Sequence, residues 1–244
     1  MRAMKCQDCV LRRDRCFRPQ SENELAFAME MHRGEITLPP RRPLIEPGRG
    51  DGGAYTLIEG WMARYRLVPG RSRYVLDILL PGDFVGLPAS LTGRAADLVA
   101  CLTAVRLCVL DKAFVSRLIR QQPELCLRFL ELNARERERI EARTALFGIG
   151  TAAQRLAYFC LEIFERLRAR GLADRSMCSF PLTRIDLSEI LGLSEVHVSR
   201  VAAELRRDGL IHLGNSIMVI LDRPGLIEVA GMLPPGITAE PLDA

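Results

Sequence analysis

Hydrophobic and polar residues alternate in short runs through the first half of the chain. Between residues 41 and 111, turn-forming Pro-Gly and Asp-Gly pairs separate runs with a period of two at 55–58, 62–68, 74–80 and 104–110. This alternation predicts strands with one buried face. Many short strands at such close spacing are typical of a small β-barrel or β-roll.

A helical period replaces the alternation after residue 112. Residues 113–122 predict a short helix, and a second helix begins at Pro123 and runs with few breakers to about Phe147. Its apolar positions, interrupted by charged residues, are Leu125, Phe129, Leu132, Ile140 and Phe147. A long helix between two domains predicts dimerisation through pairing of the helix with its copy. The alternative is one long helix packed along its own domain.

A second, mostly helical unit follows a hinge at residues 148–150. Its expected elements are helices at about 152–169, 184–191 and 195–208 and a β-hairpin of residues 211–213 and 217–221. Gly192 provides a tight bend between the last two helices, and Ser194 is suited to cap the second one. Two helices joined in this way, with a hairpin behind them, predict a winged helix-turn-helix that binds duplex DNA.

The outer face of the second helix of this pair carries the candidate DNA-contacting residues. Packing between the helices accounts for Ile190, Leu193, Val198, Val201 and Leu205, which leaves outside Ser194, Glu195, Val196, His197, Ser199 and Arg200. A helix N-terminus attracts phosphate, and arginine can bond both acceptors of a guanine edge. Arg206 and Arg207 are expected on backbone phosphates. The alternatives are an ordinary helical hairpin and, for His197, a solvent-facing side chain.

Composition narrows the class of protein. The 244 residues are 48% hydrophobic with a formal net charge of only +4, so the charge permits a polyanionic partner without requiring one. No apolar run approaches the roughly 20 residues of a membrane-spanning helix, and the start is polar and basic, unlike a signal peptide. We therefore expect a cytoplasmic protein with reduced cysteines and no membrane contact. No catalytic motif is found, so an enzyme is not expected.

The strongest family signal lies in the expected helix-turn-helix. It contains LGLSEVHVSRVAAELRRDGLI, which resembles the recognition region of the Crp/Fnr family of bacterial regulators. The resemblance covers nearly the whole chain, because the family's β-roll and the start of its dimer helix are similar to PRRPLIEPG, AYTLIEGWMARYRLVPGRSRYVLDILLPGDFVGL and VRLCVLDKAFVSRLIRQQPEL.

The resemblance implies an α+β fold with several segments. These are an N-terminal β-roll of the cyclic-nucleotide-binding, double-stranded jelly-roll type, a dimerisation helix and a C-terminal winged helix-turn-helix. The implied boundaries are a cysteine-rich arm at 1–20, the sensor roll at 21–122, the helix and hinge at 123–148 and the DNA-binding domain at 149–222. The final residues, 223–244, are rich in Pro and Gly, which predicts a loose tail. The implied partners are a second copy of the chain, a palindromic operator in double-stranded DNA, and RNA polymerase.

One position of the expected recognition helix departs from the Fnr type. In those proteins a Glu, a Ser and an Arg read the operator half-site. Ser199 and Arg200 match two of these residues, whereas Val196 stands where the Glu would be. Valine cannot accept a hydrogen bond from cytosine N4, although it can contact a thymine methyl group. The resemblance therefore implies an altered half-site.

Similarity to the cyclic-nucleotide-binding members raises the question of a ligand in the roll. Those members use a Gly-Glu pair for the ribose and an Arg-Ser or Arg-Thr pair for the cyclic phosphate. The corresponding stretches here are Gly86-Leu87-Pro88 and Ala95-Ala96-Asp97. The ribose carboxylate is missing and Asp97 would repel phosphate, so cAMP is not expected, although Arg94 leaves an altered pocket open. A cyclic-nucleotide-binding regulatory module is the alternative function.

Cysteines give a stronger indication of a sensor. Cys6, Cys9 and Cys16 place three thiols on a short arm, where they can converge on one soft metal centre. Oxygen-sensing members of the Fnr type carry a fourth cluster cysteine where Cys108 stands in VRLCVLD, and Cys101 is the nearby alternative. The resemblance thus implies a [4Fe-4S] cluster held by Cys6, Cys9, Cys16 and Cys108, although the six residues between Cys9 and Cys16 are one more than its pattern.

The residues themselves leave other roles for these cysteines open. The alternatives are a zinc ion, redox-active thiols and merely free thiols. Cys126, Cys160 and Cys178 are expected on helix faces or at the surface rather than as ligands. An intact cluster would order the arm and favour a DNA-competent dimer, and oxygen or nitric oxide would destroy it and release the DNA.

Overall fold

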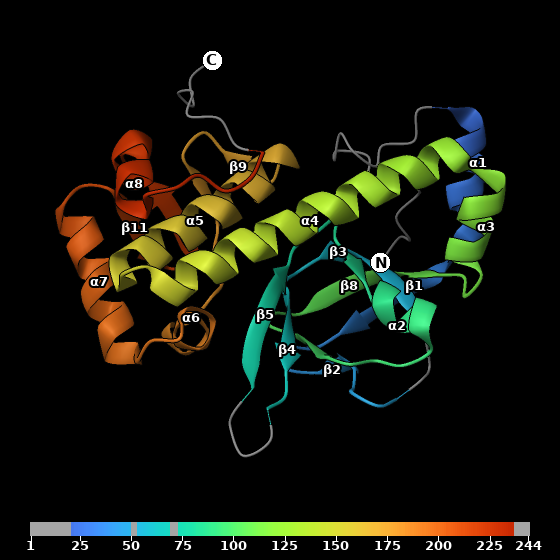
Figure 1. The fold of residues 1–244 in the computed structure, drawn as a ribbon, viewed down its shortest axis with the longest axis horizontal. Coiled ribbons are helices and arrows are strands. Elements are labelled where there is room, and N and C mark those ends of the chain that lie inside the picture. The colour runs from blue at the N-terminus through green and yellow to red at the C-terminus, as the bar shows by residue number, and fades with distance from the viewer. Residues whose placement is uncertain (1–20, 50–52, 69–72, 237–244) are drawn as a thin grey trace. The chain divides into compact units, whose positions relative to one another are not determined.

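The fold is that of a computed structural model that describes residues 21–49, 53–68 and 73–236. Contacts group the chain into two compact units, residues 1–133 and 134–244. The boundary falls inside the helix α4 (Pro123–Ile149), so the two ends of that helix belong to different units (Figure 1). Within the described residues, no helix combines the length and the hydrophobicity needed to cross a membrane.

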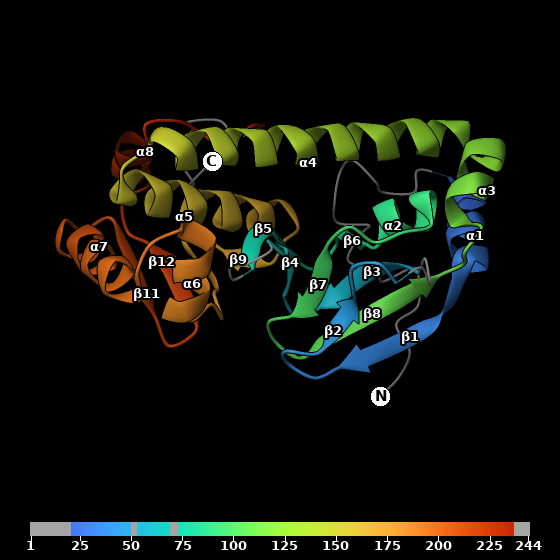
Figure 2. The same ribbon diagram turned by 60° about the horizontal axis from the view of Figure 1, so that its bottom comes forward.

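The first unit is a β-roll made of two four-stranded antiparallel sheets (Figure 2). One sheet has the order β1-β8-β3-β6 and the other the order β2-β7-β4-β5. The strands are β1 (His32–Leu38), β2 (Pro43–Ile45), β3 (Ala54–Glu59), β4 (Met62–Arg66), β5 (Tyr74–Leu79), β6 (Phe84–Val85), β7 (Leu98–Cys101) and β8 (Val105–Leu110). A short helix, α2 (Leu87–Thr92), follows β6. The roll expected from the alternating runs is confirmed.

The inner faces of the two sheets meet in an apolar core. On β8, Val105 and Leu107 belong to this core, while Arg106 between them pairs with Glu35 at 3.1 Å and with Glu59. Alternation along the strand gives one apolar and one polar face, as the sequence pattern predicted. The same alternation places Cys108 on the face that carries Arg106.

A second apolar cluster joins the roll to the start of α4. It is built from α1 (Glu22–Met31), α3 (Phe114–Gln121) and the first turns of α4 (Figure 2). The Phe84 ring lies edge-on to Phe129 with 5.2 Å between the centroids, a favourable arrangement of two aromatic rings. The start of α4 is therefore anchored in the first unit by aromatic packing.

This packing corrects the assignment of the apolar face of α4. Leu125, Phe129 and Leu132 are all buried in the second cluster. The first three residues of the face on which the sequence pattern predicted pairing between two copies thus pack inside their own unit, whereas Ile140 and Phe147, further along the helix, are half-buried. Burial of the most apolar side of a helix in the core of its own chain removes that side from water, so it is no longer available to a second copy.

The second unit contains a helix-turn-helix and a small sheet. Its elements are α5 (Ala152–Ala169), β9 (Ala173–Asp174), β10 (Met177–Ser179), α6 (Arg184–Leu191), α7 (Glu195–Arg207), β11 (Ile211–Gly214), β12 (Ile217–Ile220) and α8 (Arg223–Ala230). The sheet is antiparallel with the order β11-β12-β10-β9. Helix α5 lies at the centre, because every residue from 156 to 161 has an exposed fraction of 0%. The winged helix-turn-helix part of the expected fold is confirmed.

Residues 223–230 form α8, in a stretch for which the Pro- and Gly-rich composition predicted a tail. Asp222 caps the helix by accepting a hydrogen bond at 3.1 Å from a backbone N–H of the first turn, and Pro224 occupies that turn. Arg223 pairs with Glu165 of α5 at 2.9 Å. Residues that usually interrupt a helix therefore begin this one.

A buried carboxylate fixes the end of α4 to α5. Glu162, with 1% of its side chain exposed, accepts hydrogen bonds from Arg139 at 2.6 Å and from Arg143 at 3.4 Å. Arg166 lies 3.6 Å from the same oxygen atom. Three guanidinium groups thus compensate one buried negative charge, and removal of one member of such a group leaves a charge without its partner.

The buried face of α4 can be tested by truncation. We expect Phe129→Ala to lower the free energy of unfolding by about 3 to 5 kcal/mol, because it removes a ring from a packed cluster. Ile119→Ala is the control, since Ile119 lies on α3 with 58% exposure, and it should change stability by less than about 0.5 kcal/mol. The fluorescence of Trp61, the single tryptophan, follows denaturant unfolding of the roll. Equal losses in the two variants would contradict the assignment.

Candidate nucleic-acid interface

Helices α6 and α7 form the helix-turn-helix, and local sequence sets their ends. Thr183 caps α6 by accepting from the Asp186 N–H at 3.1 Å, and the Asp186 carboxylate accepts from the Thr183 N–H at 2.8 Å. Helix α6 ends at Gly192, whose φ of +65° is left-handed and suits glycine. Ser194 caps α7 by accepting from the His197 N–H at 3.2 Å. The bend at Gly192 and the cap at Ser194 agree with the sequence prediction.

One side of α7 packs against its unit and the other side is open. The packed side has exposures of 1% to 3% at Val198, Val201 and Leu205. The open side carries the exposed residues Glu195, Val196, Arg200, Arg206 and Arg207, with His197 and Ser199 half-buried at its edge. All the residues that the sequence placed on the outer face therefore lie on one surface of α7, behind the cap at Ser194.

The polar side chains on this surface have local partners. The Arg200 Nε atom lies 3.9 Å from Glu204, and the Arg207 Nε atom lies 3.6 Å from Asp208. Exposed pairs of this kind contribute little stability, so a ligand can displace them. The Ser199 hydroxyl donates to a backbone carbonyl one turn earlier at 2.8 Å and offers its lone pairs to a further donor.

The wing is a tight hairpin that follows α7. Strands β11 and β12 are antiparallel, with Gly214 opposite Ile217. The turn residues Asn215 and Ser216 have φ of +52° and +58°, and two left-handed residues form a turn whose twist matches that of paired strands. The sequence pattern predicted a turn at Gly214-Asn215, one residue earlier, because glycine and asparagine adopt positive φ more readily than serine.

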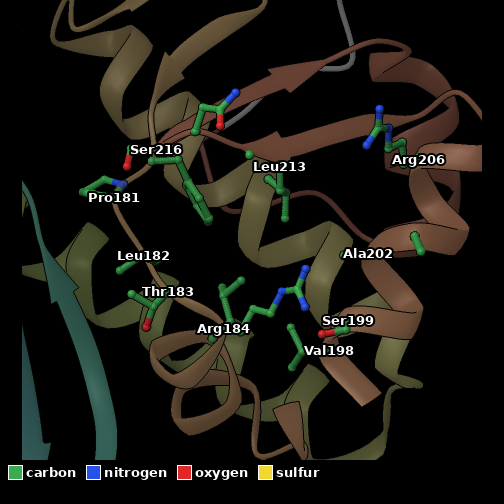
Figure 3. A pocket seen from close by; sticks show the side chains of 15 residues that line it. Pro181, Leu182, Thr183, Arg184, Val198, Ser199, Ala202, Arg206, Leu213 and Ser216 are labelled. Carbon is green, nitrogen blue, oxygen red and sulfur yellow. The ribbon is translucent and has the colours of Figure 1, made fainter. Parts of the chain in front are cut away.

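A pocket of about 400 Å³ lies between α7, the wing and the start of α6 (Figure 3). Its polar lining includes Arg184, Ser199, Arg206 and Asn215. Guanidinium groups near a helix N-terminus attract anions. The sequence pattern did not single out Arg184, and the available signal was its place as the first residue of α6, directly after the cap at Thr183.

The structure describes one of the four cysteines proposed as cluster ligands. Cys6, Cys9 and Cys16 lie outside the described residues, whereas Cys108 is half-buried on β8. Cys101, the alternative fourth ligand, is 2% exposed in the roll core, and burial raises the pKa of its thiol to about 11. Because cysteine binds metals as the thiolate, Cys108 fits a ligand role better than Cys101 does.

The remaining cysteines pack in the interior or beside it. Cys126 lies against the apolar cluster at the start of α4. Cys160 and Cys178 are buried in the second unit, and desolvation raises the pKa of both thiols, that of Cys178 to about 12. Within the described part of the chain, no group of three His, Cys, Asp or Glu side chains is arranged to hold a metal ion.

Two families of domains match this chain. A model of the Crp-like helix-turn-helix domain matches residues 154–229, and one of the cyclic nucleotide-binding domain matches residues 35–122. The first match contains α6, α7 and the wing, and the second contains most of the roll. The two units of the structure therefore correspond to two known kinds of domain.

Several regulators are similar to the chain. The nitrogen fixation regulation protein FixK of Bradyrhizobium diazoefficiens is 34% identical over 175 residues, which cover 71% of this chain and 72% of that protein. The transcriptional activator protein FnrL of Cereibacter sphaeroides is 29% identical over 93% of this chain and 92% of its own length. The solved structure of FixK2 from Bradyrhizobium japonicum has a TM-score of 0.71 and 22% identity, covers 80% of this chain and 96% of its own, and supports the fold.

Proposed function

Since the chain belongs to the Crp/Fnr family of DNA-binding transcription regulators, we propose that it binds a palindromic operator as a homodimer under the control of an iron-sulfur cluster. Its relatives FixK and FnrL are regulators rather than enzymes. The observation that carries the DNA part of the proposal is the open surface of α7, where the polar start of a capped helix faces solvent.

The base-reading residues are proposed at the start of α7. Val196 is 80% exposed, and 66% of the Arg200 side chain is exposed one turn further on. The first turns of a recognition helix contact base edges in the major groove. Ser199 and Arg200 are the proposed readers, with Val196 at the position that departs from the Fnr type. Glu195 and His197 lie beside them, and Ser194 fixes the helix start.

Phosphate contacts are proposed around the pocket between α7 and the wing. Arg184 and Arg206 both line it, and Arg207 is exposed at the end of α7. A backbone phosphate in this pocket would meet two guanidinium groups and the Asn215 side chain of the wing. Such contacts set the position of α7 on the duplex without selecting a sequence.

The second copy of the chain is proposed to pair along the exposed face of α4. Its solvent-exposed residues recur at alternating intervals of three and four: Leu127, Leu130, Ala134, Arg137, Glu141, Thr144 and Gly148. This spacing is that of a coiled-coil seam. Arg137 and Glu141 pair at 2.7 Å within one helix, and the same charges can pair between two helices. RNA polymerase is the proposed further partner of the DNA-bound dimer.

A [4Fe-4S] cluster on Cys6, Cys9, Cys16 and Cys108 is proposed as the sensor. The cluster would supply a centre that oxygen and nitric oxide attack, and the chain would supply the thiolate ligands. The half-buried Cys108 supports this assignment, because it offers its sulfur on the polar face of its sheet. Two residues further along β8, Leu110 packs against the cluster of apolar residues at the start of α4. Strand β8 therefore carries both the proposed cluster ligand, Cys108, and a residue that packs against the cluster at the start of α4.

Selection from random DNA duplexes tests the base readers. We expect the chain to enrich a palindromic motif and Arg200→Ala to relax one position of it, with a loss of about 1 to 3 kcal/mol. Val196→Glu restores a hydrogen-bond acceptor and should add a preference for cytosine.

Arg206→Gln is the matched control for that experiment. As a phosphate contact, it should weaken all duplexes alike and reduce the slope of log affinity against log salt by about one. No enriched motif, or an identical motif in Arg200→Ala, would contradict the assignment of roles.

The dimer seam is tested by adding charge. Leu130→Arg should raise the dimer dissociation constant by at least about tenfold, because it puts like charges across the paired helices. Analytical ultracentrifugation measures the change, and Ile119→Arg, at an equally exposed site on α3, should leave the dimer intact. Dimers of unchanged strength in Leu130→Arg would exclude this face of α4.

Anaerobic purification tests the cluster. We expect a coloured protein with about four iron and four sulfide per chain, Cys108→Ala to lose them, and Cys101→Ala to keep them. A colourless, iron-free protein whose DNA binding ignores oxygen would remove the cluster from the proposal. Bound zinc would do the same, and loss of iron in Cys101→Ala alone would reassign the fourth ligand.

A further inference from the structure

The outer face of the β1-β8-β3-β6 sheet carries a hydroxyl group beside Cys108. Strand β3 alternates, so Leu57 belongs to the core between the two sheets and Thr56 lies on the opposite face. Cys108 lies on that face as well, because its neighbour Leu107 is in the core. Thr56 and Cys108 are directly opposite each other on adjacent strands. Side chains paired in this way have Cβ atoms about 4.5 to 5.5 Å apart, so they can contact each other.

The Thr56 hydroxyl is buried without a partner. The residue is 1% exposed, and its Oγ1 atom has no hydrogen-bond partner within the part of the chain that the structure describes. A buried polar group without a hydrogen bond carries a desolvation penalty, which a valine of nearly the same shape would avoid. The hydroxyl therefore indicates an acceptor that forms in another state of a neighbouring group.

Cys108 is the neighbour that can become such an acceptor. The residues directly beside Thr56 on this face are Cys108 and Phe84 across the strands and Ala54 and Ile58 along β3. Three of these four side chains are hydrocarbons. The thiol of Cys108 is a weak donor, and its Sγ atom lies 3.9 Å from the Val109 carbonyl oxygen.

Arg106, the next residue of β8 on this face, is not an acceptor. It pairs with Glu35 of β1 at 3.1 Å and with Glu59 of β3. A guanidinium group has donors only, so it cannot accept the Thr56 O–H. A sulfur atom that has lost its proton or binds a metal ion carries negative charge, and hydrogen bonds to charged groups are the strong ones.

We propose that Thr56 is a positioning residue for an anionic sulfur at Cys108, to which its hydroxyl donates a hydrogen bond. A free thiolate and a sulfur that holds the proposed cluster both present this chemistry, and the second case rests on the proposed function. A hydrogen bond to the charged form of a group favours that form. Hydrogen bonds to the sulfurs of a cluster also set its reduction potential. Thr56 thus stabilises the ligand form of Cys108.

Alkylation of the cluster-free full chain tests the free-thiolate case. Iodoacetamide reacts with the thiolate, and trypsin releases residues 107–112 with Cys108 as their single cysteine, so mass spectrometry follows this residue alone. At one fixed pH near neutrality, we expect Thr56→Val to slow the reaction by at least about threefold. A thiolate fraction about tenfold smaller is partly offset by a more nucleophilic sulfur. Thr56→Ser, which keeps the hydroxyl, should stay within about twofold of the wild-type rate.

Thr37→Val is the matched control for that experiment. Thr37 is exposed on β1 of the same sheet, where it lies opposite Arg106. The same substitution there should leave the alkylation of Cys108 unchanged. A slower reaction in Thr37→Val as well would assign the effect to a general change in the sheet and overturn the proposal.

Anaerobically loaded protein tests the metal-bound case. Loss of a hydrogen bond to a ligand sulfur lowers the reduction potential and makes oxidation easier, so we expect the visible absorption of Thr56→Val to bleach in air at least about twofold faster. Thr56→Ser should bleach at the wild-type rate. Slower alkylation with unchanged bleaching would support the hydrogen bond to the free thiolate alone.

Denaturant unfolding separates this role from a structural one. In cluster-free chain at pH 6, where Cys108 is a neutral thiol, Thr56→Val should be at least as stable as the wild type, followed by the fluorescence of Trp61. A loss of stability that Thr56→Ser restores would show a partner of the hydroxyl elsewhere in the chain and overturn the proposal, as would an unchanged alkylation rate in Thr56→Val. An iron-free protein removes the cluster from the proposed function, whereas the alkylation of Cys108 still decides the role of Thr56. The two failures are therefore distinguishable.

Discussion

One buried carboxylate, Glu162, holds the end of α4 to the helix around which the DNA-binding unit is built. Its three arginine neighbours come from α4 and from α5 itself, and α5 is almost completely buried along its middle. Helices α6, α7 and α8 are arranged on this central helix. Ion pairs in a buried site tolerate little displacement, because each lost hydrogen bond leaves a charge poorly solvated. Within the second unit, α4 and the recognition helix therefore share a rigid support.

Helix α4 makes two kinds of contact along one side and leaves the opposite side open. Apolar residues at its start pack into the aromatic cluster of the first unit, and arginines near its end surround Glu162. The opposite side, from Leu127 to Gly148, is open to solvent. This division explains why hydrophobicity alone did not indicate the face on which pairing is proposed. The most apolar residues belong to the core of one chain, and the proposed seam includes a charged pair and a glycine, which do not form an apolar stripe.

Features that are determined within one short segment could be predicted from the sequence, whereas features that depend on distant parts of the chain could not. The helix-turn-helix follows from a capping serine, a glycine in a left-handed conformation and packing residues at helical spacing, all within one short segment. Helix α8 was missed because Pro224 lies in its first turn, where proline starts a helix instead of breaking it. The pocket beside α7 could not be recognised, since its polar lining comes from α6, α7 and the wing, which meet only in the folded unit.

The exposed Val196 has a consequence for a cell that holds several regulators of this family. With a Glu at that position, a protein gains a hydrogen bond to cytosine worth about 1 to 3 kcal/mol, and a valine forgoes it. Two such proteins would then prefer different sites even if the rest of their recognition helices were the same. Under the proposed reading of the half-site, the valine would direct the two regulators to different operators. Their gene sets can stay separate through one missing acceptor, without any new contact evolving elsewhere.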